Sequence, residues 1–311
     1  MNNPFRYSDT NLRYHSYSYY LKDKYHQKVF KVPLNAGFTC PNRDGKCGVG
    51  GCRFCSSHGS GDIITTNDDL QQQFKIGKDV MLKKWPNGKA IAYFQAFSNT
   101  YASLDHLKKV FQPFILDNDI LELAIATRPD CLDTEKILYF STINKIKPLT
   151  IELGLQSIND QTMRSMNRGH DHSCLYDVVN QLKLTDIRIC VHIINGLPYE
   201  TPEMMLATAK AVADMNVNGI KIHMLNILKD AQIAQDYLNG KINLLSEKEY
   251  IAIVIKQLEL LPPEMVIERL TGDGLRNNLL APLWILKKTV VLNDIAKEMV
   301  RLDTWQGKKY Q

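Results

Sequence analysis

Short apolar runs alternate with amphipathic segments along most of this chain. Six runs are rich in β-branched and aromatic residues, and between them apolar residues recur at helical spacing. The run over 90–97 is apolar almost throughout, which is typical of a strand covered on both faces. This alternation predicts an α/β fold with a parallel sheet or barrel of six βα units. The predicted strands cover 28–32, 90–97, 121–127, 150–157, 187–195 and 219–228, and Pro33 is expected to end the first.

The pattern changes after about residue 239. A capping-box sequence that starts at Ser246 predicts a helix over 246–261, an extra strand is expected over 265–270, and a last helix over 288–301. These changes divide the chain into a tyrosine-rich N-terminal segment, residues 1–27, a core, residues 28–240, and a C-terminal extension, residues 241–311, that packs on the barrel.

Length, composition and charge narrow the class of protein. The 311 residues, 44% of them hydrophobic, are enough for one large core or two smaller ones. No apolar run is long enough to span a bilayer, and the first residues lack the apolar centre of a signal peptide. We therefore expect a cytoplasmic protein without a membrane partner, in which the seven cysteines stay reduced. The net charge of +5 is compatible with an RNA partner without requiring one.

Four cysteines crowd one glycine-rich loop, at positions Cys40, Cys47, Cys52 and Cys55. Thiolates clustered in a loop bind a metal ion or an iron–sulfur centre, and glycines let the backbone wrap closely around it. The spacing alone leaves three interpretations open. The loop could hold a structural zinc, although only Cys52 and Cys55 form a CxxC pair, or a ferredoxin-type centre that starts at Cys47. Alternatively, three of the four cysteines hold a [4Fe–4S] cluster and leave one iron open.

A cysteine loop at the end of the first strand, followed by five further βα units, resembles the radical S-adenosylmethionine (SAM) superfamily. The resemblance covers residues 28–240 and implies a partial (βα)6 TIM-type barrel with a [4Fe–4S] cluster and SAM as cofactors. In that superfamily three cysteines ligate three irons and SAM chelates the fourth. Cys40, Cys52 and Cys55 match those ligands, whereas Cys47 is expected to be a bystander, because a fourth thiolate would occupy the iron that SAM needs.

Further residues are expected to contact SAM, because α/β barrels place functional groups at the carboxyl ends of their strands. The second strand lacks the Gly-Gly-Glu that many superfamily members use for the amino group of SAM, and polar residues stand there instead. The Thr-Arg-Pro-Asp run at 127–130 and the pair of motifs at 154–157 and 167–170 are similar to the branch that includes the elongator catalytic subunit. The predicted cofactor-binding residues are Gln95, Ser98, Asn99, Arg128, Glu152, Gln156, Arg168 and Asn195.

Three basic residues of the later strands are candidates for catalysis, namely Lys221, His223 and His192. Lys221 and His223 share one face of the sixth strand, and a lysine inside a barrel is costly unless it is paired. His192 stands where related dehydrogenases have an acidic residue. A histidine that is simply satisfied in the core is the alternative for His192.

The whole chain resembles a bacterial family close to the elongator catalytic subunit, the YhcC/YtqA-type radical SAM proteins. This resemblance implies a transfer RNA substrate, with carboxymethylaminomethyl-uridine at the wobble position converted to aminomethyl-uridine, and an electron donor such as flavodoxin or ferredoxin. If so, we expect the N- and C-terminal segments to flank the mouth of the barrel. The alternatives are a radical SAM enzyme that acts on a small metabolite and a zinc-stabilised, non-catalytic RNA-binding protein.

Overall fold

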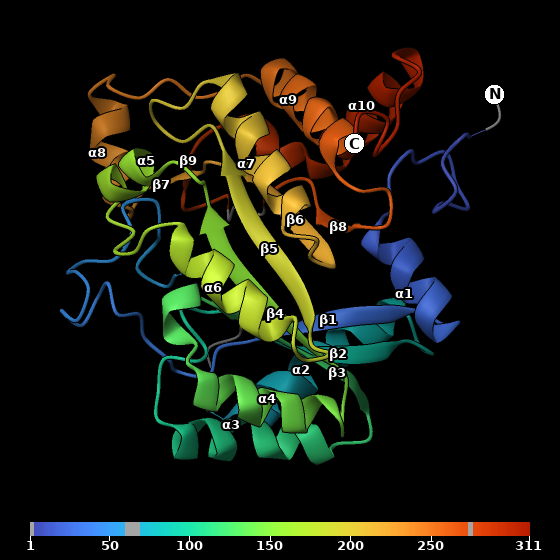
Figure 1. Cartoon of the computed structure of the whole chain (residues 1–311), viewed down its shortest axis with the longest axis vertical. Coiled ribbons are helices and arrows are strands. Elements are labelled where there is room, and N and C mark those ends of the chain that lie inside the picture. Colours follow the sequence, from blue (N-terminus) through green and yellow to red (C-terminus); the bar gives the residue numbers. More distant parts are fainter. Residues whose placement is uncertain (1–2, 60–68, 273–275) are drawn as a thin grey trace.

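A curled sheet of parallel strands forms the centre of the molecule (Figure 1). The computed structural model describes residues 3–59, 69–272 and 276–311, and within them the sheet has seven strands in the order β1-β2-β3-β4-β5-β6-β8. The predicted fold class is therefore confirmed: it is an α/β partial TIM-type barrel with a C-terminal extension. The strands are β1 (Val29–Leu34), β2 (Lys89–Phe94), β3 (Ile120–Thr127), β4 (Leu149–Gln156), β5 (Arg188–Asn195), β6 (Gly219–Met224) and β8 (Val266–Arg269).

Helices connect the strands and cover the outer face of the sheet (Figure 1). Several helices begin after a side chain that accepts a bond from the first turn, as Asp69, Ser103 and Asp133 do. In the described part of the chain, no helix is long and apolar enough to cross a membrane. The helices are α1 (Tyr17–Tyr25), α2 (Leu70–Lys84), α3 (Leu104–Leu116), α4 (Thr134–Asn144), α5 (Asp160–Ser165), α6 (Ser173–Leu182), α7 (Pro202–Asp214), α8 (Ile233–Leu238), α9 (Glu247–Leu260) and α10 (Lys288–Arg301), with 3₁₀ turns at Pro129–Cys131 and Leu283–Lys287.

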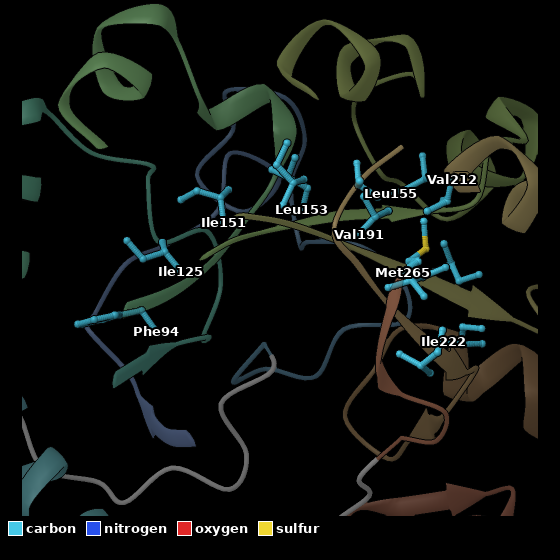
Figure 2. Packing of buried hydrophobic residues seen from close by; sticks show 14 of the residues in the cluster. Phe94, Ile125, Ile151, Leu153, Leu155, Val191, Val212, Ile222 and Met265 are labelled. Carbon is cyan, nitrogen blue, oxygen red and sulfur yellow. The ribbon is translucent and has the colours of Figure 1, made fainter. Parts of the chain in front are cut away.

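The alternation of side chains along each strand separates the hydrophobic core from the interior of the barrel. In β4, Ile151, Leu153 and Leu155 belong to the main cluster of buried apolar residues (Figure 2). The residues between and after them, which include Glu152 and Gln156, line an interior cavity instead. Because the apolar side chains face the helices, the polar side chains of the same strand are left facing inward.

Three details differ from the expectation. Pro33 does not end β1 but lies within it, which an edge strand tolerates because its outer side needs no N–H donor. The strand predicted over 219–228 breaks after Met224, and its last residues form β7 (Ile227–Leu228), which pairs with β9 (Leu279–Ala281) in a separate antiparallel ladder. The extra strand predicted over 265–270 is β8, which joins the sheet parallel to β6.

Strands β1 and β8 are the two edges of the sheet, and side chains bridge the gap between them. Lys31 Nζ of β1 lies 2.9 Å from Glu268 Oε2 of β8. Helix α1 contacts both edge strands, and Ser16, just before it, forms a parallel bridge with Ile267. The N-terminal segment therefore lies across the open side of the partial barrel.

The terminal segments pack at the amino ends of the strands. Gln306 Nε2 donates to the carbonyl oxygens of Pro262 and Met265, which come just before β8, at 2.6 and 2.8 Å. The hydroxyl of Tyr25, at the end of α1, donates to Glu122 near the start of β3 at 2.9 Å. The cysteine loop, in contrast, follows the carboxyl end of β1. The expectation that both terminal segments flank the mouth of the barrel is therefore wrong for these residues.

Candidate active site

The cysteine loop is held by its own backbone and by glycines in conformations that other residues avoid. Gly45, Gly50 and Gly51 have φ values of 93°, 81° and 84°, which an L side chain rarely adopts. The amide of Gly51 donates to the carbonyl of Asn42 at 2.8 Å, and the amide of Cys55 donates to that of Cys52 at 2.9 Å. These local bonds define the path of the loop before any cofactor is considered.

Three of the four loop thiols face one cavity of about 690 Å³ inside the barrel. Cys40, Cys52 and Cys55 line the cavity, whereas Cys47 does not. The side chain of Cys47 is exposed, with its Sγ atom 4.0 Å from Asp130 Oδ2. The structure thus brings the three predicted ligands together and leaves the predicted bystander outside, although their role as ligands stays a prediction.

Positive groups surround these thiols. Arg128 Nη1 lies 3.7 Å from Cys40 Sγ, and Arg168 Nη1 lies 3.8 Å from Cys52 Sγ. A hydrogen bond from the Cys55 thiol, together with the two guanidinium groups, holds the pKa of Cys52 well below its usual value despite burial. Asp130 orients Arg128 through two bonds, of 2.8 and 2.6 Å. The same hydrogen bond and burial raise the pKa of Cys55 well above its usual value, so these surroundings favour the metal-binding thiolate form at Cys52 in particular.

The donor set suits a cluster with one open iron. Among residues 3–59, 69–272 and 276–311, no three His, Cys, Asp or Glu side chains converge where a single metal ion could sit. In a cluster each thiolate binds its own iron, and three thiols that line one end of a cavity can do this. Cys40, Cys52 and Cys55 are therefore the residues that would hold the cluster, which would supply the radical chemistry.

The predicted SAM contacts divide into two groups. Six of them line the cavity: Gln95, Ser98, Arg128, Glu152, Gln156 and Arg168. The other two make internal bonds. The Asn99 amide donates to the carbonyl of Ala126 at 2.9 Å, and the Asn195 amide exchanges bonds of 2.8 Å with Gln257. The structure therefore does not bring the side chains of Asn99 and Asn195 into the site.

Gly154, Gln156 and Arg168 form a tightly packed group at the end of β4. Gln156 has a φ of 72°, an uncommon value for a residue other than glycine, at a bulge in the pairing with β5. Arg168 Nη2 donates to the carbonyl of Gly154 at 2.6 Å, and a Cβ atom on Gly154 would lie 2.7 Å from the Gln156 amide. The Nε atom of Arg168 is buried with no hydrogen-bond partner among the described residues. A strained backbone and an unsatisfied donor together favour a ligand at this position.

The predicted catalytic residues lie deeper in the barrel, around the carboxylate of Glu152. This carboxylate accepts bonds from Lys31 at 2.7 Å, Tyr93 at 2.8 Å and His192 at 2.9 Å, and it also contacts Lys221. Although burial raises it, Lys221 and Lys31 hold the pKa of Glu152 well below its usual value. Glu152, predicted as a SAM contact, is thus placed with the catalytic candidates rather than beside the thiols.

His223 completes this deeper region. Its ring centre lies 5.5 Å from that of His192, and burial, Arg269, His192 and Lys221 hold its pKa well below the usual value. Four residues that were not predicted from the sequence line the same region, namely Lys31, Tyr93, Glu268 and Arg269. One signal was present, because Lys31 is a lone charge in an otherwise apolar strand. Glu268 and Arg269 were not predicted to lie in the site, because the strand over 265–270 was assigned to the C-terminal extension and not to the barrel.

A partial barrel with three loop cysteines at one end of its cavity defines an enzyme of the radical SAM type. The chain belongs to the radical SAM superfamily: the superfamily profile matches residues 40–212, and the Radical_SAM C-terminal domain matches residues 217–301. Members of this superfamily use a [4Fe–4S] cluster and SAM. Membership decides between the interpretations of the cysteine loop, in favour of the cluster with one open iron.

Two relatives that match 85% or more of the chain place it more closely within the superfamily. It is 47% identical over 311 residues to the uncharacterized protein YtqA of Bacillus subtilis, and the match covers 100% of this chain and 97% of that protein. It is 34% identical over 268 residues to protein YhcC of Escherichia coli K12, and the match covers 85% of this chain and 85% of that protein. The chain is thus similar to the family that the sequence resemblance indicated.

Solved structures share the fold at low sequence identity. Elp3 of the archaeon Methanocaldococcus infernus matches with a TM-score of 0.69 and 15% identity, over 90% of this chain and 64% of that chain. The chain therefore spans less than two thirds of that protein. Methylornithine synthase matches with a TM-score of 0.50 and 9% identity, over 93% of this chain and 87% of that chain.

Proposed function

We propose that this radical SAM enzyme acts on the wobble uridine of transfer RNA and converts carboxymethylaminomethyl-uridine to aminomethyl-uridine. The observation that carries the proposal is a single cavity with three thiols at one end and a buried, basic region at the other. Radical chemistry at the first end can therefore reach a charged side chain held at the second.

Distant relatives support a transfer RNA substrate. The tRNA uridine(34) acetyltransferase of Methanocaldococcus infernus is 23% identical over 154 residues, which cover 49% of this chain and 28% of that protein. The tRNA-2-methylthio-N(6)-dimethylallyladenosine synthase of Endomicrobium trichonymphae is 25% identical over 148 residues. The net charge of +5 is also compatible with RNA. An anticodon loop is single-stranded, so its wobble base can leave the stack at low cost.

The proposed conversion balances with SAM as the oxidant. The bond between the side-chain nitrogen and the carboxymethyl carbon is cleaved with one water molecule, and the two-carbon piece leaves as glyoxylate. This oxidation releases two electrons, which are taken up as SAM becomes methionine and 5′-deoxyadenosine. The bound cluster and SAM supply the abstraction of a hydrogen atom from carbon.

The residues of this chain supply binding and proton handling. Arg128 and Arg168 lie beside the thiols. Gln156 and Arg168 both line the cavity, and we propose that they bind SAM. Phe54, Phe97 and Ile194 give the cavity apolar walls that exclude water. Lys221, His192 and His223 are the candidates that take or give protons on the substrate nitrogen. Because SAM takes up both electrons, an electron donor would be needed only to bring the cluster to its reduced state before turnover. Flavodoxin or ferredoxin is our proposal for this donor, and we place the reaction in the cytoplasm.

A small-metabolite substrate is the second candidate. The cavity of about 690 Å³ has the size of an ordinary small-molecule site, and this observation favours it. Such an enzyme would show no salt-dependent binding of RNA, whereas each phosphate contact with single-stranded RNA changes the logarithmic salt slope by about −0.7.

Nucleoside mass spectrometry of bulk transfer RNA from a deletion strain tests the proposal. We expect carboxymethylaminomethyl-uridine to accumulate and aminomethyl-uridine to fall, with both restored by the intact gene but not by a Cys52→Ala variant. In vitro, the reconstituted enzyme should form 5′-deoxyadenosine, glyoxylate and aminomethyl-uridine in equal amounts. If the nucleoside does not accumulate in a strain that lacks a second pathway, the substrate is wrong even where SAM is cleaved.

A further inference from the structure

Three basic side chains lie side by side on neighbouring strands inside the barrel. In the pairing of β5 with β6, His192 stands opposite Lys221, and in the pairing of β6 with β8, Lys221 stands opposite Arg269. All three line the cavity, and so does His223, two residues further along β6. We call His192, Lys221 and Arg269 the basic row. The row crosses three strands at one level, deeper in the barrel than the cysteine loop.

Positive charge exceeds negative charge around the basic row. In the described lining of the cavity both carboxylates, Glu152 and Glu268, lie at this deep end, where Lys31 and the two permanently basic members of the row bring three Lys and Arg side chains. Glu152 is already bonded to Lys31, Lys221, His192 and Tyr93, and Glu268 is bonded to Lys31 and Arg188. Lys31, Lys221 and Arg188 therefore share only two carboxylates, those of Glu152 and Glu268. Excess buried charge is costly, and an anion bound in the cavity would compensate it.

Donors remain for such an anion. An ammonium group has three N–H donors, and Lys221 directs bonds to two acceptors among the described residues, the Tyr93 hydroxyl at 3.0 Å and Glu152. A network that served only the fold would be expected to satisfy its donors.

We infer that the basic row, with His223, binds a carboxylate group of the substrate at the end of the cavity remote from the three cysteines. The inference rests on the proposed function, whose substrate carries one carboxylate at the tip of the uridine side chain. A guanidinium fork such as that of Arg269 matches a carboxylate through two parallel bonds, and Lys221 adds a point charge beside it. With the carboxylate on the row, the adjoining carbon and nitrogen lie between the row and the thiols.

A binding experiment with two matched RNAs tests this site. The probes are an anticodon stem–loop with carboxymethylaminomethyl-uridine and the same RNA with the carboxamide, which has the same shape without the charge. The reconstituted enzyme with SAM should bind the acid about tenfold or more tightly than the amide, since bonds to charged groups are the stronger ones. Lys221→Gln and Arg269→Gln should each reduce this ratio to near one.

Matched variants separate charge at the row from charge in general. Lys28→Gln removes one positive charge from the lining of the same cavity, where the ammonium lies over the Trp85 ring, and should keep the full ratio. Arg269→Lys retains charge without the fork and should keep part of the ratio. If Arg269→Gln does not fold, Arg269→Lys is measured in its place, and a partial loss of the ratio is the expected result.

The outcomes assign the carboxylate to its source. If Lys221→Gln and Arg269→Gln weaken SAM binding as much as RNA binding, the row holds the carboxylate of SAM and the inference is overturned. A second pair of probes, N-ethylglycine and N-ethylglycinamide, is scored by the thermal shift of the same enzyme. If no RNA binds but N-ethylglycine is preferred and Lys221→Gln abolishes the preference, the proposed function fails and the inference stands. No preference for the acid with either pair overturns the inference.

Discussion

The two ends of the cavity are built in different ways. At the cysteine end, three thiols come from one loop of 16 residues, 40–55, whose path is set by glycines and local backbone bonds. At the deep end, every strand of the sheet except β3 contributes one or two polar residues: Lys31, Tyr93, Glu152, His192, Lys221, His223, Glu268 and Arg269. The first end depends on spacing along the chain, whereas the second depends on the register between strands.

This difference makes the deep end the more fragile part of the design. A shift of one residue in β6 would turn Lys221 and His223 towards the helices and bring Ile220 and Ile222 into the cavity. The cysteine loop would survive such a shift unchanged. Substitutions should therefore remove the cofactor at one end, and alter stability and charge recognition at the other.

The largest expected effect is at the cysteine end. Cys40→Ala, Cys52→Ala and Cys55→Ala should each lose nearly all of the iron taken up during anaerobic reconstitution, because two thiolates do not hold a cluster that needs three. Cys47→Ala is the control and should keep its iron, since its side chain lies outside the cavity. Equal loss in Cys47→Ala and Cys52→Ala would refute the three-ligand assignment.

At the deep end, Glu152→Gln should lower the free energy of unfolding by about 3 kcal/mol, because Lys31 and Lys221 lose their shared counter-charge. Urea denaturation of the reconstituted protein under anaerobic conditions measures this change. Glu122→Gln is a matched control, in which a buried carboxylate pairs with Lys24, whose side chain is 33% exposed and can be solvated instead. We expect a smaller loss there, and an equal loss would contradict the special role of the deep network.

Between the two ends, Gln156→Ala and Arg168→Ala should each weaken SAM binding about tenfold, which corresponds to about 1.4 kcal/mol. Equilibrium binding to the reconstituted protein measures this effect. Since Gln156 has a positive φ, Gln156→Gly separates backbone strain from the lost amide: the glycine variant should also bind SAM weakly. Iron content checks that Arg168→Ala, which loses a contact with Cys52, still holds its cluster. Unchanged SAM affinity in both alanine variants would sink the assignment.

The smallest expected effect is a pH dependence from the deep end. Burial, Arg269, His192 and Lys221 depress the pKa of His223, with Glu152 acting in the opposite sense. Histidine therefore binds a proton in the unfolded chain before it does so in the folded one, and stability falls as the pH decreases below about 6.5, by up to about 1.4 kcal/mol per pH unit. His223→Gln should reduce this slope. The pKa of His192 is also lowered, so part of the slope should remain.

Urea midpoints measured across this pH range test the last prediction. The control is His106→Gln, which replaces an exposed histidine on α3, outside the cavity, and separates the effect of His223 from that of losing any histidine. A slope that is identical in wild type and His223→Gln would show that the histidine titrates alike in the folded and unfolded chain.

Much of the fold could be read from periodicity because each βα unit combines two clear repeats. The strand over 150–157 was predicted within one residue of β4, and the helix over 288–301 coincides with α10. The place of Pro33 inside β1 was missed because a proline is tolerated within a strand only at the edge of a sheet, and edge positions depend on strand order. The break after Met224 was missed because the residues that follow it pair with β9, which is distant in the sequence. Asn99 and Asn195 were assigned to SAM for a related reason: an amide at a strand end can bind a ligand or a neighbouring backbone, and only the fold distinguishes them.

By itself, the sequence determined the βα alternation, the shared face of Lys221 and His223 in the sixth strand, and the loop that groups the cysteines. These follow from local rules, namely a period of two in strands, a period of 3.6 in helices and short-range turn geometry. The tertiary structure decided which strands are neighbours. It brought β8 from the C-terminal part of the chain to the edge of the sheet, so that Arg269 lies beside Lys221 and Glu268 reaches Lys31. Nothing local encodes that pairing, because it depends on how the long connection from β6 to β8 packs on the rest of the barrel.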